Sequence, residues 1–159
     1  MRTIRREALV PFSAPAMFDL IERVEDYPLF LPWCLATHLL ERTEDSVSAT
    51  VDVGVRDLRV RVTTRNDKRP PEYMAIHLES GSFRHFHGEW ILRPLGPGGC
   101  HVTFMLRYEF ALRAEAIAGR WIDQAADRMV DAFVQRAESR FVTPAVTARI
   151  RIGPADPST

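Results

Sequence analysis

An almost perfect two-residue alternation runs from residue 46 to residue 55 and restricts what this chain can fold into. Valine or alanine fills every odd position of the segment, and small or polar residues fill every even position. Because successive side chains of a strand point to opposite faces, the alternation predicts a half-buried antiparallel strand. The same pattern continues at Leu58, Val60 and Val62, which alternate with Arg59, Arg61 and Thr63. The core must therefore include a sheet with one buried and one solvated face.

Other segments extend this sheet to about seven strands. Pro70 and Pro71 end the second strand, because proline has no N–H to donate to a neighbouring strand. The run from Pro94 to Gly99 supplies prolines and glycines for a hairpin turn. Further strands are predicted at residues 3–10, 35–42, 73–79, 84–93 and 101–110. Consecutive strands joined by short turns favour a single antiparallel sheet.

The helical segments lie outside this run of strands. Ser13 can cap a helix that has Pro15 in its first turn and reaches about Arg23, and a shorter helical turn covers residues 25–31. A long helical pattern without proline covers residues 114–141, and its apolar stripe winds ~40° per four residues. A helix lying obliquely across a strongly curved sheet can bury such a stripe. The predicted class is therefore α+β: a curved sheet around a long C-terminal helix, with two short helices after the first strand.

Residues 24–34 combine two prolines with several large apolar side chains where a short helix should end. Pro28 and Pro32 stop the helix and favour extended backbone before them, so Phe30 and Trp33 are held on a stiff, irregular segment. The stretch from Pro28 to Trp33 is suited to be the mobile gate of a ligand cavity. The alternative is an apolar plug that only closes the core.

Several motifs in a fixed order resemble a known family. They are Val24-Glu25-Asp26-Tyr27-Pro28, Phe30-Leu31-Pro32-Trp33-Cys34, Val62-Thr63-Thr64-Arg65-Asn66, Gly81-Ser82-Phe83 through Gly88-Glu89-Trp90, and Met129-Val130-Asp131-Ala132-Phe133 through Arg136-Ala137. Together they resemble the coenzyme Q-binding protein and ribosome-association toxin family of the START-like, polyketide-cyclase-like superfamily. Two departures are Ser82, where the family usually has proline, and Ile91-Leu92, where phenylalanine is expected after Trp90. The resemblance implies the helix-grip fold and the bacterial branch of the family.

Length and composition are consistent with one such domain. The chain has 159 residues, of which 46% are hydrophobic, which suffices for one core and not for two ordinary ones. We expect a START-like lipid-binding domain at residues 1–143. Residues 144–159 are rich in proline and small residues and are expected to form a disordered or loosely attached tail.

Charge and cysteine content restrict partners and compartment. The formal net charge is zero, so no overall field draws the protein to nucleic acid, and no DNA partner is expected. Cys34 and Cys100 have neither disulfide-framework nor zinc spacing, which favours reduced thiols and no metal site. No signal peptide or membrane-spanning segment is recognisable. The expected location is the cytoplasm, with peripheral contact at the inner membrane left open.

A catalytic site is not predicted. His85 and His87 would share one strand face and lie near Glu109 and Arg107 of the paired strand, so a His–Glu pair is geometrically feasible. A solvated cross-strand charge pair is the simpler interpretation. No phosphate-binding loop, HExxH or GxSxG motif is present. A non-enzymatic role is therefore expected, and a cyclase or hydrolase of the wider superfamily is the weakest alternative.

The predicted interior suits a ligand that is held mostly by apolar burial. The resemblance implies ubiquinone or another polyprenyl lipid, bound in support of respiration and without further cofactors. Tyr108 could hydrogen-bond a quinone carbonyl, and each of the candidates could equally be ordinary core. The candidate ligand-binding residues are Phe30, Trp33, Trp90, Phe104, Tyr108, Trp121, Met129 and Phe133.

A second function implied by the resemblance is a toxin that binds the large ribosomal subunit and blocks subunit joining. Such a protein needs a surface that faces phosphates. Residues 56–69 contain six basic and two acidic side chains, although a solvated outer face would also explain this. The candidate ribosome-binding residues are Arg59, Arg61, Arg65, Lys68 and Arg69.

Overall fold

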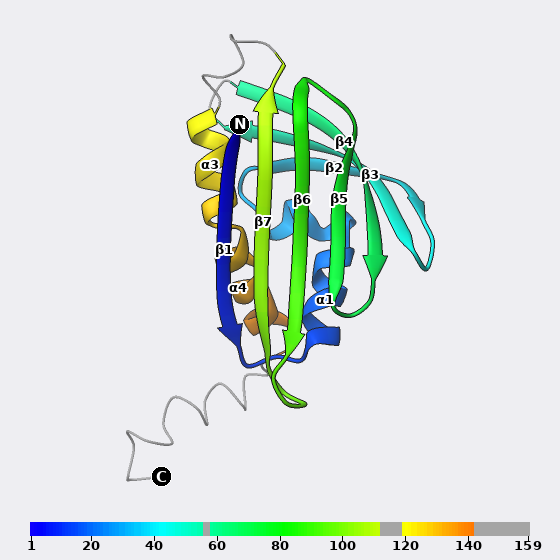
Figure 1. The fold of residues 1–159 in the computed structure, drawn as a ribbon, viewed down its shortest axis with the longest axis vertical. Coiled ribbons are helices and arrows are strands. Elements are labelled where there is room, and N and C mark those ends of the chain that lie inside the picture. The colour runs from blue at the N-terminus through cyan, green and yellow to red at the C-terminus, as the bar shows by residue number, and fades with distance from the viewer. Residues whose placement is uncertain (56–57, 112–118, 142–159) are drawn as a thin grey trace.

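A single antiparallel sheet of seven strands dominates the structure, a computed structural model that describes residues 1–55, 58–111 and 119–141. The strand order is β1-β7-β6-β5-β4-β3-β2. Figure 1 shows the sheet strongly twisted, with the β2–β3–β4 end turned across the direction of β1, β7 and β6, and the helices on one side. The strands are β1 (Arg2–Val10), β2 (Cys34–Arg42), β3 (Ser46–Val55), β4 (Leu58–Arg69), β5 (Tyr73–Gly81), β6 (Phe83–Pro94) and β7 (Cys100–Phe110). The predicted α+β helix-grip class is confirmed.

Two short helical stretches follow β1, as predicted. Helix α1 (Ala14–Glu22) is capped by Ser13, whose hydroxyl accepts a 3.2 Å hydrogen bond from the N–H of Ala16. A 3-10 turn, η1 (Val24–Asp26), leads directly into α2 (Tyr27–Phe30), which ends before Pro32. The proline-rich segment thus connects α1 to the start of β2, and it contacts β2 through η1 and α2 and α4 through α2.

The C-terminal helix is bent rather than continuous. It consists of α3 (Gly119–Asp127) and α4 (Met129–Phe141), with Arg128 between them. The N–H of Arg128 is shared between the carbonyls of Gln124 and Ala125, both at 3.2 Å, and the Arg128 carbonyl already accepts from Ala132. The predicted long C-terminal helix is confirmed in a bent form, in which α3 contacts β1 and α4 contacts β1 and β7. The start predicted at residue 114 and the tail at 144–159 lie outside the described residues.

The core fills the concave side of the sheet. The inner faces of β6 and β7 supply Trp90, Leu92, Val102, Phe104 and Tyr108, each at most 3% exposed. Helix α1 covers them with fully buried side chains, and α4 contributes Val130, Phe133 and Ala137. Within the described ranges, no helix is both long and apolar enough to cross a membrane.

Candidate functional site

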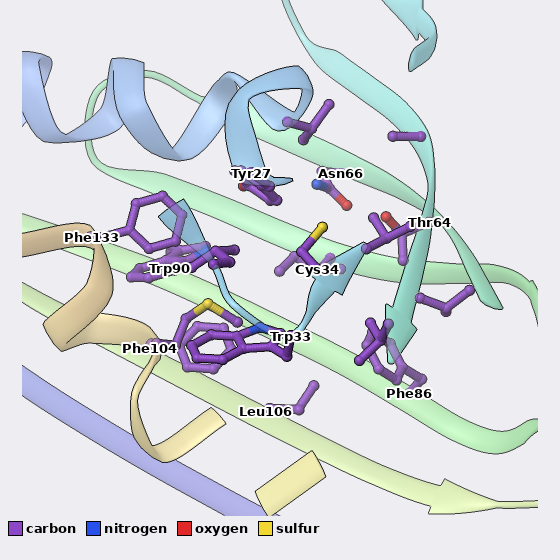
Figure 2. Close-up of a pocket in the computed structure, with 18 residues that line it drawn as sticks. Tyr27, Trp33, Cys34, Thr64, Asn66, Phe86, Trp90, Phe104, Leu106 and Phe133 are labelled. Carbon is purple, nitrogen blue, oxygen red and sulfur yellow. The ribbon is translucent and has the colours of Figure 1, made fainter. Parts of the chain in front are cut away.

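A cavity of about 150 Å³ lies between the concave face of the sheet, the start of β2 and helix α4. Figure 2 shows side chains from both layers pointing into it. Its lining is almost entirely apolar, and none of the lining side chains in the described part of the chain is an acid or base that is charged at neutral pH. The lining residues are Val24, Tyr27, Leu31, Trp33, Cys34, Ala49, Val51, Val53, Val62, Thr64, Asn66, Ile76, Phe86, Trp90, Phe104, Leu106, Met129 and Phe133.

Five of the eight candidate ligand-binding residues line this cavity. They are Trp33, Trp90, Phe104, Met129 and Phe133. Phe30 lies behind Phe133, with ring centroids 5.0 Å apart, and is not part of the lining. The structure therefore brings together residues from α2–β2, β6, β7 and α4 that are far apart in the sequence.

Phe133 is the centre of an aromatic cluster that forms one wall. Its ring lies 5.5 Å from Tyr27, 5.0 Å from Phe30 and 5.0 Å from Trp90, in each case nearly perpendicular to its neighbour. Edge-to-face geometry is favoured because the positive ring edge meets the negative ring face. Trp90 in turn packs on Phe104 at 4.7 Å, so the cluster joins α4 to the sheet.

The Tyr108 hydroxyl, which the sequence suggested for a quinone carbonyl, hydrogen-bonds to helix α3. Its hydroxyl lies 2.8 Å from the carbonyl oxygen of Gly119 and 2.7 Å from Oδ1 of Asp123, and it can donate to either. Burial, followed by the neighbouring Asp123, raises the pKa of this phenol, so it stays protonated. The hydroxyl is thus engaged by α3, and Tyr108 is not among the residues that line the cavity.

A second hollow, of about 320 Å³, opens on the other side of Trp33. Trp121 lines this hollow and not the main cavity. Its remaining lining comes from the segment before β2, the end of β3 and the bend between α3 and α4: Pro32, Gly54, Gln124, Ala125 and Arg128. Trp33 therefore borders both spaces.

Polar atoms reach the main cavity from β4 and β2. Thr64 and Asn66 project from the inner face of β4, and the Asn66 oxygen Oδ1 is buried without a hydrogen-bond partner. The Tyr27 hydroxyl is engaged, because it donates to the carbonyl of Ile21. Burial raises the pKa of the Cys34 thiol to about 11, so this group is neutral at pH 7. The sequence analysis missed both β4 residues, although continuing the even-numbered alternation to residue 66 would have placed them on the inner face.

Four of the five candidate ribosome-binding residues share the outer face of the sheet. Arg59, Arg61, Arg65 and Arg69 occupy odd positions of β4 and are exposed. Some of their charge is compensated, since Arg61 pairs with Asp52 at 2.7 Å and Arg65 lies 3.4 Å from Asp67.

Lys68 does not belong to this surface. Its even position turns it to the inner face, where its side chain is 6% exposed and its ammonium lies 3.1 Å from Glu22 of α1. Arg42 of β2 also contacts Glu22 and pairs with Glu25 at 2.8 Å. The group of Lys68, Glu22, Arg42 and Glu25 is therefore an ion cluster, largely buried at Lys68 and Glu22 and exposed at Arg42 and Glu25, that joins the helices to the sheet.

The two histidines considered for catalysis lie on the outer side of the sheet, away from the cavity. His85 is 3.9 Å from Glu109, and His87 is 4.0 Å from Glu89; both rings are substantially exposed. His85 and Glu109 form a solvated cross-strand pair, whereas His87 and Glu89 are two residues apart on the same strand, β6. Among the described residues, no three His, Cys, Asp or Glu side chains are grouped so as to hold a metal ion.

Comparison with known proteins gives matches over most of the chain. Residues 10–134 match the family described as polyketide cyclase / dehydrase and lipid transport. The chain is 41% identical to the ribosome association toxin RatA of Pseudomonas aeruginosa, over 87% of this chain and 96% of that protein. It is 24% identical to the mitochondrial coenzyme Q-binding protein COQ10 of Drosophila melanogaster, over 94% of this chain and 64% of that protein.

Solved structures share the fold. Protein TTHA0849 from Thermus thermophilus superposes with a TM-score of 0.78 at 14% identity, covering 88% of this chain and 99% of that chain. A START superfamily protein from Mycobacterium smegmatis gives 0.66 at 19% identity, covering 87% and 95%. The Zhui aromatase/cyclase from a Streptomyces species gives 0.62 at 19% identity, covering 99% of each chain. Given the match over residues 10–134 and the 41% identical relative, this chain belongs to the polyketide cyclase/dehydrase and lipid transport family, in the branch of the ribosome-association toxins and coenzyme Q-binding proteins.

Proposed function

We propose that this chain binds an uncharged, ring-bearing lipid, of which a polyprenyl quinone is the leading candidate, and that it does so without catalysing a reaction. The supporting observation is the apolar cavity, whose titratable lining groups, Tyr27 and Cys34, both have raised pKa values. A charged ligand would lose its hydration there without a counter-ion. The same neutrality leaves no ready acid–base pair in the lining, so a cyclase or hydrolase is the weakest candidate.

The volume of the cavity decides how such a lipid can be held. About 150 Å³ accommodates a substituted ring and little of a long tail. The tail must therefore leave the cavity, and the hollow beyond Trp33 is the nearest continuation. Each methylene buried along this route contributes about 0.8 kcal/mol, or roughly 3 to 4 kcal/mol per isoprene unit.

The test is mass spectrometry of the organic extract from freshly purified protein. Val51→Phe should fill the cavity from β3, and Thr50→Phe is the matched control because Thr50 faces the other side of the same strand. We expect a neutral lipid in near-stoichiometric amount in wild type and control, and its loss from Val51→Phe. Equal lipid in both variants, or only traces in every sample, would contradict the proposal.

A second candidate function is association with the large ribosomal subunit. It is supported by the 41% identity to a protein named as a ribosome association toxin and by the exposed arginines of β4. Co-sedimentation with ribosomes over a salt series tests it, because contacts to phosphate weaken as salt rises. We expect Arg59→Glu combined with Arg69→Glu to reduce co-sedimentation while Val51→Phe leaves it unchanged. Salt-independent binding, or binding unaffected by the arginine changes, would refute this assignment.

A further inference from the structure

Among the described residues that line the cavity, Asn66 carries a buried polar atom without a hydrogen-bond partner. The residue is 6% exposed, it lines the cavity, and its Oδ1 has no hydrogen-bond partner. The large majority of buried side-chain polar atoms in native proteins are paired, so an orphaned amide oxygen at a cavity wall requires an explanation. Figure 2 shows the amide at the end of the cavity where Tyr27 is also drawn.

The fold itself does not use this amide oxygen. Asn66 is aligned with Val47 on β3 and with Ile76 on β5, so both sides of its backbone are covered by neighbouring strands. The Tyr27 hydroxyl, which also belongs to the lining, is already committed to the carbonyl of Ile21. An apolar side chain at position 66 would serve packing better than an amide with an unsatisfied acceptor.

The inner face of β4 changes character along its length. Val62 is apolar, Thr64 carries a hydroxyl, Asn66 an amide, and Lys68 a charge that is paired with Glu22. Only the middle two reach the cavity as uncharged polar groups. A ligand with one polar end would therefore be oriented with that end toward Asn66 and its apolar part toward Trp90, Phe104 and Leu106.

We propose that Asn66 is the anchor for an oxygen-bearing ring of the ligand, of the quinone and hydroquinone class. This assignment rests on the proposed function, since it names the recognition group within the same cavity. The amide oxygen accepts from a ring hydroxyl, and rotation of the amide by half a turn presents its NH₂ to a ring carbonyl. One side chain can thus hold both the reduced and the oxidised form of the same lipid, which a purely donating or purely accepting site could not do.

The experiment compares three small probes of matched shape: butylbenzoquinone, butylhydroquinone and butylbenzene. Their dissociation constants are measured by NMR titration of the full chain, for wild type, Asn66→Leu and Val51→Ala. Asn66→Leu removes the amide at similar volume, and Asn66→Val is the second variant if leucine crowds the strand. Val51→Ala is the control, because it trims an apolar part of the same lining.

We expect Asn66→Leu to weaken both oxygen-bearing probes about tenfold, as for one lost hydrogen bond, and to leave butylbenzene unchanged. Val51→Ala should weaken all three by a similar factor. If the three probes bind wild type but Asn66→Leu affects them equally, or affects none, Asn66 is not the anchor. If no probe binds wild type, the proposed function fails first, so the two failures are distinguishable.

Discussion

Phe133→Ala is the most informative perturbation of the packing that closes the cavity. Phe133 is 1% exposed and makes edge-to-face contacts with Tyr27, Phe30 and Trp90. Truncating a buried phenylalanine to alanine costs about 3–5 kcal/mol. Because one side of the ring already faces an empty space, we place the loss in the lower part of that range, at about 3–4 kcal/mol.

Urea unfolding followed by tryptophan fluorescence measures this loss, since Trp90 is in direct contact with the ring. For a chain of this size, a loss of about 3–4 kcal/mol corresponds to a fall in Tm of roughly 6–16 °C. Phe141→Ala is the control on the same helix: Phe141 is 39% exposed, and its ring lies 5.8 Å from that of Phe12. We expect it to lose less than about 1.5 kcal/mol.

A loss for Phe133→Ala that is no larger than that of Phe141→Ala would refute the reasoning. It would mean that the ring cluster does not join α4 to the sheet. An unchanged m-value is also expected, because the variant should remain folded with the same surface buried; a large change in the m-value would show that the native state itself has loosened.

Three further outcomes follow from the geometry. Glu22→Gln should lower the free energy of unfolding, measured with urea, by about 3–5 kcal/mol, because it leaves the buried ammonium of Lys68 without its carboxylate. Lys68→Met should lower it clearly less, since Arg42 still neutralises Glu22. Burial raises the pKa of the Cys34 thiol to about 11 from an ordinary value of 9, so its thiolate is scarce near pH 8 and becomes abundant only toward pH 11. Iodoacetamide labelling of Cys34 at pH 8, followed by mass spectrometry, should therefore be about 100-fold slower than labelling of an exposed thiol. Tyr108→Phe should lower the free energy of unfolding by about 1–3 kcal/mol, because it deprives α3 of a hydrogen bond, and should leave lipid occupancy of the purified protein unchanged.

Periodicity accounted for most of the fold. The alternation in β3 and β4 correctly separated the buried valines from the exposed Arg59 and Arg61, and the proline and glycine positions located the turns. The features that the sequence did not predict depend on contacts between elements that are distant in the chain. No proline or glycine marks the bend at Arg128, on either side of which α3 contacts β1 and α4 contacts β1, β7 and α1.

The sequence predicted which face of each strand points toward the candidate site, but not which residues of that face line the cavity. Trp90 and Phe104 were placed on the inner face and do line the cavity, whereas Tyr108 is on the same face of β7 but meets α3. Lys68 was grouped with its neighbours as a charge cluster along the chain, although its even position turns it inward to Glu22. Asn66 was quoted in a family motif but not named as a site residue, because an unsatisfied oxygen is visible only once the surrounding atoms are placed.

The pairing of the first strand with the last has a consequence for how this protein is made. Arg2 of β1 is aligned with Tyr108 of β7, so about 100 residues must be synthesised between the two partners. At about 5–20 residues per second, β1 waits on the order of 5 to 20 seconds for its neighbour. During that delay it is an unpaired strand, and its charged side chains, among them Arg2, Arg5, Arg6 and Glu7, discourage pairing with other nascent chains. These charges therefore oppose aggregation of the nascent chain before the sheet has formed. Their neutralisation should lower the yield of folded protein from cells more than it lowers the stability of the folded protein.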